Sequence, residues 1–266
     1  MNLVEYGIDT SQLREITLAD KPKIDSLLSL APNLGCENCF TNLFVWRGIY
    51  LLKLLYIAED RAVIYNGRDK CIYFPIGRIP SPRELLEIHR AFSENKLLLP
   101  DSRIYNVPPD YPEKFPEARA LFDFDANPGE ADYIYDVEKQ IALTGPKLRK
   151  KRNHIKHFTA QNPNASVEPI GESNFKSVLR FMDSEDDKKH LFAEEVAIAE
   201  AFENFRTLGL YGTVLYSEPG KIAAAAVMGP MSSTAHSVHF EKSDKLVEGA
   251  SQMIVKLSLI HISEPT

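Results

Sequence analysis

The sequence is poor in cysteine, with three in 266 residues, and it has a single tryptophan. Three cysteines cannot supply four thiolates, which excludes a four-cysteine zinc site within one chain. Cys36 and Cys39 form a Cys-x-x-Cys pair without a thioredoxin-like context. We interpret them as packing residues and expect no metal centre.

Long apolar runs and a signal sequence are also missing. Residues 1–9 carry Glu5 and Asp9 and no apolar segment, which argues against a secretory signal peptide. The most apolar window, residues 43–58, contains Arg47 and Lys53 and is too short to span a bilayer. We therefore expect a cytoplasmic protein without a transmembrane segment.

The chain also lacks an excess of positive charge, since its formal net charge is -6 and its pI is about 5.7. General coating of nucleic acid needs a broadly basic surface, so that class of function is excluded. The hydrophobic content of 44% over 266 residues is enough to build two cores. Any polyanion must therefore be bound locally.

Against this acidic background, cations gather in residues 145–158. Leu148, Ile155 and Phe158 recur at helical spacing, which predicts an amphipathic helix that begins at Pro146 and carries its polar residues on the outward arc. Those residues are Lys147, Arg149, Lys150, Lys151, Arg152, Asn153, His154 and Lys156. Because like charges repel at this density, we predict that residues 147–154 bind phosphates, with Arg149 and Arg152 together on one face. A solvated basic face is the alternative.

The remaining pattern predicts an α+β chain in two halves, residues 1–128 and 129–256. In the first half we expect helices at 22–30 and 82–96 and strands at 50–57, 62–65 and 71–74. In the second half we expect strands at 133–135, 166–170, 213–216, 221–228 and 236–241, and helices at 146–158, 173–182, 193–208 and from Gly249. Strand, two helices, three antiparallel strands and a helix is the order of the GNAT (acyl-CoA N-acyltransferase-like) fold. The first half resembles a weaker copy, so we predict tandem GNAT-like domains with a site in the cleft between them.

Several segments resemble the phosphatidylglycerol lysyltransferase C-terminal domain family. They are residues 40–46, residues 132–135, residues 145–158 with their Lys-Lys-Arg-Asn-His core, Glu194-Glu195, Gly212, and residues 239–242. The resemblance extends from the first helix to about Lys256 and implies two tandem GNAT-like domains. In membrane-bound members of the family, it implies transfer of an amino acid from aminoacyl-tRNA to a lipid head group on the cytoplasmic side.

The chain departs from this family in two respects. The family continues beyond the last helix with an Asn-Arg-Glu segment and closing strands, whereas residues 257–266 resemble translated sequencing-adapter sequence. We therefore expect a second domain truncated near residue 256 and a non-native tail. We see no flippase-type membrane domain ahead of the fold in this sequence. We therefore expect the acceptor to be either a small molecule or a lipid head group.

Aminoacyl transfer needs a base that removes the proton of the acceptor. His239 and Glu241 alternate along a predicted strand, so we expect them to share a face and to form a general-base pair. An exposed polar sheet face is an equal alternative. Glu195, near the start of a predicted helix, is a third catalytic candidate, although the helix dipole alone accounts for a carboxylate there.

The sequence therefore predicts an aminoacyltransferase that takes its donor from aminoacyl-tRNA or another phosphate-bearing carrier and needs no bound cofactor. An acyl-CoA-dependent N-acetyltransferase is one alternative. It is weakened because Glu248 stands in the loop at residues 245–250 where a diphosphate-binding glycine is expected. A binding module that keeps the fold without the chemistry is the other.

Overall fold

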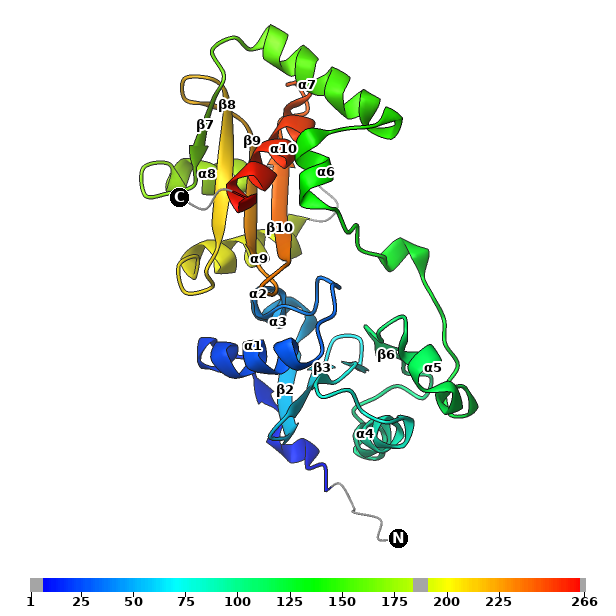
Figure 1. Ribbon diagram of the computed structural model, residues 1–266. Helices are drawn as coiled ribbons and strands as arrows, with labels where there is room; N and C mark the ends of the chain where they lie inside the picture. Colours follow the sequence, from blue (N-terminus) through cyan, green and yellow to red (C-terminus); the bar gives the residue numbers. More distant parts are fainter. Residues whose placement is uncertain (1–6, 184–190, 264–266) are drawn as a thin grey trace. The chain divides into compact units, whose positions relative to one another are not determined.

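The computed structural model describes residues 7–183 and 191–263, and the chain divides into two compact units, residues 1–132 and 133–266 (Figure 1). Each unit contains its own sheet flanked by helices, so the chain is α+β. The predicted boundary followed residue 128, and the division by contacts follows Asp132.

The first unit is built on a six-stranded sheet with the order β1-β2-β3-β4-β6, in which β5 also pairs with β3. The strands are β1 (Arg14–Glu15), β2 (Leu52–Ala58), β3 (Arg61–Asn66), β4 (Cys71–Tyr73), β5 (Ile76–Gly77) and β6 (Ile104–Tyr105), and the helices are α1 (Lys21–Leu30), α2 (Phe40–Val45), α3 (Arg47–Tyr50), α4 (Pro82–Glu94) and α5 (Tyr111–Lys114). The predicted hairpin of β2 and β3 is confirmed, and β3 is buried at every position.

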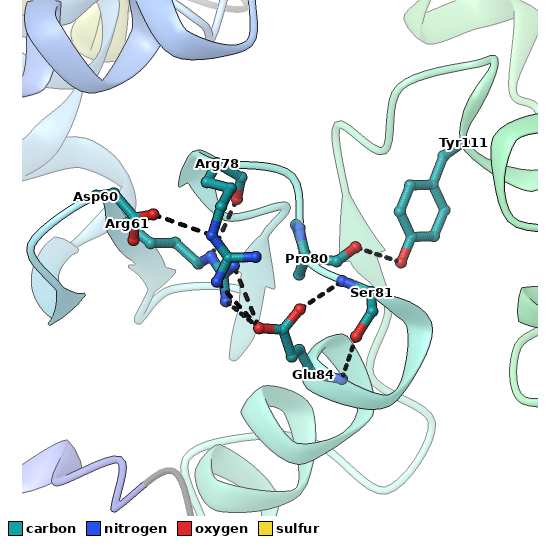
Figure 2. A network of polar contacts seen from close by, with 7 residues as sticks. All are labelled: Asp60, Arg61, Arg78, Pro80, Ser81, Glu84 and Tyr111. Atoms are coloured by element: carbon teal, nitrogen blue, oxygen red, sulfur yellow. Dashed lines mark hydrogen bonds and ion pairs between the residues drawn. The ribbon is translucent and has the colours of Figure 1, made fainter. Parts of the chain in front are cut away.

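A buried arginine joins this hairpin to α4 (Figure 2). Arg61 is 2% exposed, and its Nη1 lies 3.4 Å from Glu84 Oε1, which Arg78 also approaches at 3.1 Å. The other oxygen of Glu84 accepts from the Ser81 amide at 2.7 Å, while Ser81 Oγ accepts from the Glu84 amide at 3.3 Å. The sequence Ser-Pro-Arg-Glu thus forms the capping box that it predicts, and the network stabilises the first unit.

The second unit is built on a four-stranded antiparallel sheet with the order β10-β9-β8-β7. Its strands are β7 (Ser166–Pro169), β8 (Tyr211–Glu218), β9 (Lys221–Pro230) and β10 (His236–Ser243), and its helices are α6 (Val137–Ala142), α7 (Arg149–Gln161), α8 (Phe175–Met182), α9 (Leu191–Glu203) and α10 (Ala250–Ser263). A short 3₁₀ turn, Pro146–Leu148, leads into α7, so the α-helix begins three residues later than predicted.

Helices cover both faces of this second sheet. On one face, alanines of β9 pack with Phe158 of α7 and Ile254 of α10, and their small side chains let the helices approach closely. On the other face, Lys242 of β10 donates to the carbonyl of Met182 at the end of α8. Helix α9 packs against α8 through the ring contact of Phe175 with Phe202. The sheet therefore separates an α7/α10 layer from an α8/α9 layer.

Three predicted elements differ from the structure. The strand predicted at 133–135 is wrong, since this segment pairs with no described strand. Helix α9 ends at Glu203, five residues earlier than predicted, and turns lead to Gly209, whose φ is +71°. Residues 257–263 of the predicted tail continue α10, and 264–266 lie outside the described residues.

Candidate functional site

Helix α7 presents two different sets of cations. Lys151 lies in the inward row with Leu148, Ile155 and Phe158 and is half-buried, although the sequence predicts it on the outward arc. Of the side chains predicted on the outward arc, Lys147 of the preceding 3₁₀ turn and Arg149, Lys150, Asn153 and Lys156 of α7 are exposed. The helix therefore offers an outward basic face and a single inward ammonium group.

Arg152 has a structural role. Its Nη1 donates to the carbonyl of Leu143 and, at 2.8 Å, to the carbonyl of Gly145. Leu143 is the left-handed residue that ends α6, so Arg152 satisfies a carbonyl that a helix end leaves without an intrahelical partner. The prediction that Arg149 and Arg152 share one outward face is therefore wrong: Arg149 is exposed, whereas Arg152 is half-buried and turned to the preceding loop.

Lys151 contacts two side chains, Tyr135 and Gln140, and its charge acts on a third, Glu241. Its Nζ lies 5.2 Å from the centroid of the Tyr135 ring and 3.4 Å from Gln140 Oε1 of α6. On β10, Glu241 Oε1 accepts a hydrogen bond of 3.2 Å from Ser251 Oγ of α10. We call Tyr135, Gln140, Lys151, Glu241 and Ser251 the Lys151 cluster.

The electrostatics of the Lys151 cluster centre on Glu241. The Glu241 side chain is exposed, and the partial desolvation of its carboxyl by neighbouring groups raises its pKa above the ordinary value of 4.5, while the Ser251 hydrogen bond and the charge of Lys151 offset part of that rise. A carboxyl with a raised pKa is a stronger base once it is ionised. Glu241 thus has the chemistry that a general base needs.

His239 does not lie beside Glu241, because β10 contains a bulge. The register with β9 shifts between Val238 and Phe240, which leaves His239 as the extra residue. A Cβ placed on Gly229 would come within 2.8 Å of His239 Nε2, and the alternation along β9 puts Gly229 on the α8 side with Ala225. The prediction of a shared face is therefore wrong: His239 faces the α8/α9 layer, and Glu241 faces the α7/α10 layer.

His239 and Glu195, the other two catalytic candidates, both lie in the α8/α9 layer and not with Glu241. Burial lowers the pKa of His239 to about 4, so its ring is neutral at physiological pH. Glu195 lies in the first half of α9, half-buried and in the α8/α9 layer. Of the three predicted catalytic residues, Glu241 is the one that joins the predicted basic segment.

The loop before α10 is closely covered by α7. Gly249 has a φ of +83°, and a Cβ there would lie 2.4 Å from the carbonyl oxygen of His154. The carboxylate oxygens of Glu248 lie 3.6 Å from His154 Nδ1 and 3.3 Å from His157 Nδ1. His154, predicted to contact a ribose or phosphate, thus faces a carboxylate of the same unit.

Lys147, Arg149, Lys150 and Lys156 form no ion pair with any residue that the structure describes. Many cations elsewhere on the surface are paired, as in Arg90–Glu87, Lys114–Asp110 and Arg119–Glu113. Among the described residues, these four charges are therefore not neutralised by an acidic partner.

The sequence contains signals for part of the Lys151 cluster. Ser251 follows directly on the glycine loop and stands in the first turn of α10, which is a usual position for a polar ligand-binding group. Tyr135 belongs to a segment that the sequence singles out but assigns to a strand. Gln140 carries no signal, because it is one polar residue among several on a short helix.

One group in the first unit offers possible metal ligands. Ligand atoms of Cys36, Glu37 and Asp132 lie within 4.8 Å of one another. Burial and the two carboxylates raise the pKa of the Cys36 thiol, so a metal ion would have to displace the thiol proton to bind there. Asp132 instead accepts a hydrogen bond of 2.8 Å from the Cys36 amide, which indicates a structural role.

Comparisons with known proteins agree with this architecture. Residues 29–262 match the model of a family described as phosphatidylglycerol lysyltransferase, C-terminal. A conserved protein of unknown function from Bacteroides thetaiotaomicron VPI-5482 is similar in structure, with a TM-score of 0.81 and 26% identity, over 94% of this chain and 86% of that chain. No curated protein matches the chain.

A second solved structure is more distant. L-PGS from Bacillus licheniformis has a TM-score of 0.61 and 15% identity, over 95% of this chain and 75% of that chain. At this identity the likeness shows the fold alone. In the ranges that the structure describes, no helix has the length and apolar character to cross a bilayer.

Proposed function

Since the chain belongs to the phosphatidylglycerol lysyltransferase C-terminal family, we propose that it transfers an aminoacyl group from aminoacyl-tRNA to a hydroxyl or amine acceptor. We further propose that each unit is a GNAT-like domain and that the second unit holds the donor. A tRNA-borne donor places the reaction in the cytoplasm. The family name makes the phosphatidylglycerol head group the first acceptor to test.

The observation that carries this proposal is the basic face of α7, whose cations form no ion pair among the described residues and lie on the helix that also carries Lys151. Four exposed cations that form no ion pair among the described residues suit the closely spaced phosphates of an RNA strand. Lys151 lies on the inward side of the same helix, where it contacts Tyr135 and Gln140, and its charge lowers the pKa of Glu241. A donor bound along the outward face would be held by the helix that also carries a side chain into the proposed catalytic group.

Glu241 suits the role of general base. In the proposed step, its carboxylate takes the proton of the acceptor hydroxyl or amine, and the acceptor atom bonds to the aminoacyl carbonyl carbon. The ester bond to the terminal ribose then breaks, and the ribose oxygen leaves with a proton. Ser251 holds the Glu241 carboxylate in place, and the Lys151 ammonium favours negative charge that develops on the carbonyl oxygen.

The surroundings of α10 weigh against acyl-CoA as the donor. A diphosphate needs free space and backbone N–H groups at the helix start. Here the His154 carbonyl lies against Gly249, and the carboxylate of Glu248 lies in the same loop. Both groups present negative charge or partial negative charge to a phosphate. A phosphate-bearing donor therefore finds a more favourable surface on the outward face of α7.

A transfer assay tests the proposal. The full chain is incubated with lysyl-tRNA labelled in lysine and with phosphatidylglycerol vesicles, and the label is measured in the lipid fraction and in small-molecule products. We expect transfer by the wild type and little by a variant in which Lys147, Arg149, Lys150 and Lys156 are replaced by Ala.

The matched control removes three lysines and one arginine from exposed positions outside α7: Lys53, Arg83, Lys176 and Lys221. This control should transfer as the wild type does. Equal loss in both variants would mean that net charge alone matters and would contradict a specific site on α7. Binding of tRNA without transfer to any acceptor would instead assign the chain as a binding module.

A further inference from the structure

The segment before α6 exposes three large apolar side chains in a row. Tyr133 is 85% exposed, Ile134 66% and Tyr135 51%. Such exposure is unfavourable for aromatic rings, whose burial would otherwise stabilise the fold. Because the segment forms no strand, pairing does not explain this geometry. These side chains are therefore available to a partner.

The two tyrosine rings are arranged in parallel. Their centroids lie 6.3 Å apart, and their planes are within 9° of each other. This separation is close to twice the roughly 3.4 Å rise between successive stacked bases. Flat, parallel, exposed rings are the feature by which proteins stack on unpaired nucleic-acid bases.

Positive charge adjoins these rings. Lys151 Nζ lies 5.2 Å from the centroid of Tyr135, and the exposed cations of α7 belong to the same helix. An apolar protein partner would have to remove water from this ammonium, which is unfavourable. A partner that combines flat apolar rings with phosphates matches both parts of the surface.

We propose that Tyr133 and Tyr135 form a stacking platform for the unpaired bases at the 3′ end of the tRNA donor. The outward cations of α7 then contact the phosphates, and the rings contact the bases. This inference rests on the proposed function, since it assumes that the donor is a tRNA. It goes further by naming which part of the RNA is recognised and by which residues.

Binding to two forms of one tRNA tests the platform. The probes are an unacylated tRNA and the same tRNA trimmed of its unpaired 3′ nucleotides. The wild type should bind the intact form more tightly than the trimmed form. Replacing both tyrosines by Ala should weaken binding of the intact tRNA about tenfold to a hundredfold, because one or two base stacks are lost. Binding of the trimmed tRNA should stay unchanged.

Two control variants separate stacking from other effects. Changing both tyrosines to Phe keeps the rings and should retain the preference for intact tRNA. Phe192→Ala removes an aromatic ring that is 81% exposed on α9 and should change nothing. Because Phe192 is highly exposed and Tyr135 contacts Lys151, the melting temperature should equal that of the wild type for Phe192→Ala and fall only slightly when both tyrosines are changed to Ala, which is checked by circular dichroism.

The results distinguish the two proposals. If the wild type binds both tRNA forms and the Ala variant keeps its preference for intact tRNA, the platform is wrong and the function of α7 stands. If the wild type binds neither form, both are wrong. Loss of the preference in the Ala variant alone supports the platform.

Discussion

Ser251 Oγ donates a hydrogen bond of 3.2 Å to Glu241 Oε1, which joins the first turn of α10 to the edge strand β10. This contact holds the carboxylate in the α7/α10 layer, while the neighbouring bulge turns His239 to the other layer. The proposed chemistry of the second unit therefore depends on one carboxylate and its two neighbours, Ser251 and Lys151.

Glu241→Gln should reduce aminoacyl transfer by about a hundredfold to ten-thousandfold, the usual contribution of a general base. Glutamine can still accept the hydrogen bond from Ser251, so melting temperature and tRNA binding should not change. The wild-type rate should rise with pH through the raised pKa of Glu241, because only the ionised form accepts a proton. A variant that keeps both the rate and this pH dependence would exclude Glu241 as the base.

His239→Asn should make the protein less sensitive to mild acid. The pKa of His239 is about 4 in the folded protein and about 6.5 in the unfolded chain, so the unfolded chain takes up the proton first as pH falls. Wild-type stability should therefore fall by about 2 to 3 kcal/mol between pH 6.5 and pH 4 through this group. The pKa of His236 is also lowered by burial, so the Asn variant should lose part of this dependence. Urea unfolding across this pH range measures the free energy of unfolding for both proteins. An Asn variant with the same pH dependence as the wild type would contradict the burial of His239.

Arg152→Ala should destabilise the second unit by about 1 to 3 kcal/mol, because the carbonyls of Leu143 and Gly145 lose a charged donor. Since Arg152 is turned to this loop, its loss should leave the salt dependence of tRNA binding nearly unchanged. Arg149→Ala changes an exposed position, so it should reduce the salt dependence of tRNA binding and leave the stability of the second unit nearly unchanged. Denaturant unfolding and salt titration compare the two variants, and equal effects on both measurements would contradict the different positions of these arginines.

Gly249→Ala should destabilise the second unit strongly. The residue has a φ of +83°, and the added Cβ would lie 2.4 Å from the His154 carbonyl oxygen, so α7 must move. Gly220→Ala is the matched control, since its φ is +77° and no atom lies within 4 Å of the added Cβ. The control should lose about 1 kcal/mol for the backbone conformation alone. Equal melting temperatures for the two variants would show that α7 does not press on the loop before α10.

The elements with strong local signals could be predicted from the sequence. The capping box at Ser81 and Glu84 and the hairpin of β2 and β3 are formed by residues close in the chain. The amphipathic pattern of α7 likewise gives its inward residues Ile155 and Phe158. The α+β class follows from such signals.

The site could be predicted only in part, because its details depend on contacts distant in sequence. The bulge at His239 arises from pairing with β9, and a one-residue shift moves side chains to the other face. Lys151 lies inward because Tyr135 and Gln140 surround its ammonium, whereas its charge alone suggests the surface. Neither the bulge at His239 nor the inward position of Lys151 can be predicted from hydrophobic periodicity.

The central claim is that the outward cations of α7 bind RNA phosphates, and the salt dependence of tRNA binding tests it most directly. For the wild type, the logarithm of the binding constant should fall steeply with the logarithm of salt concentration. Replacing Lys147, Arg149, Lys150 and Lys156 by Ala should reduce the magnitude of this slope by about 3, since each phosphate contact contributes about 0.7 to 0.9. The control variant at Lys53, Arg83, Lys176 and Lys221 should keep the wild-type slope. Identical slopes for the wild type and the α7 variant would contradict the account.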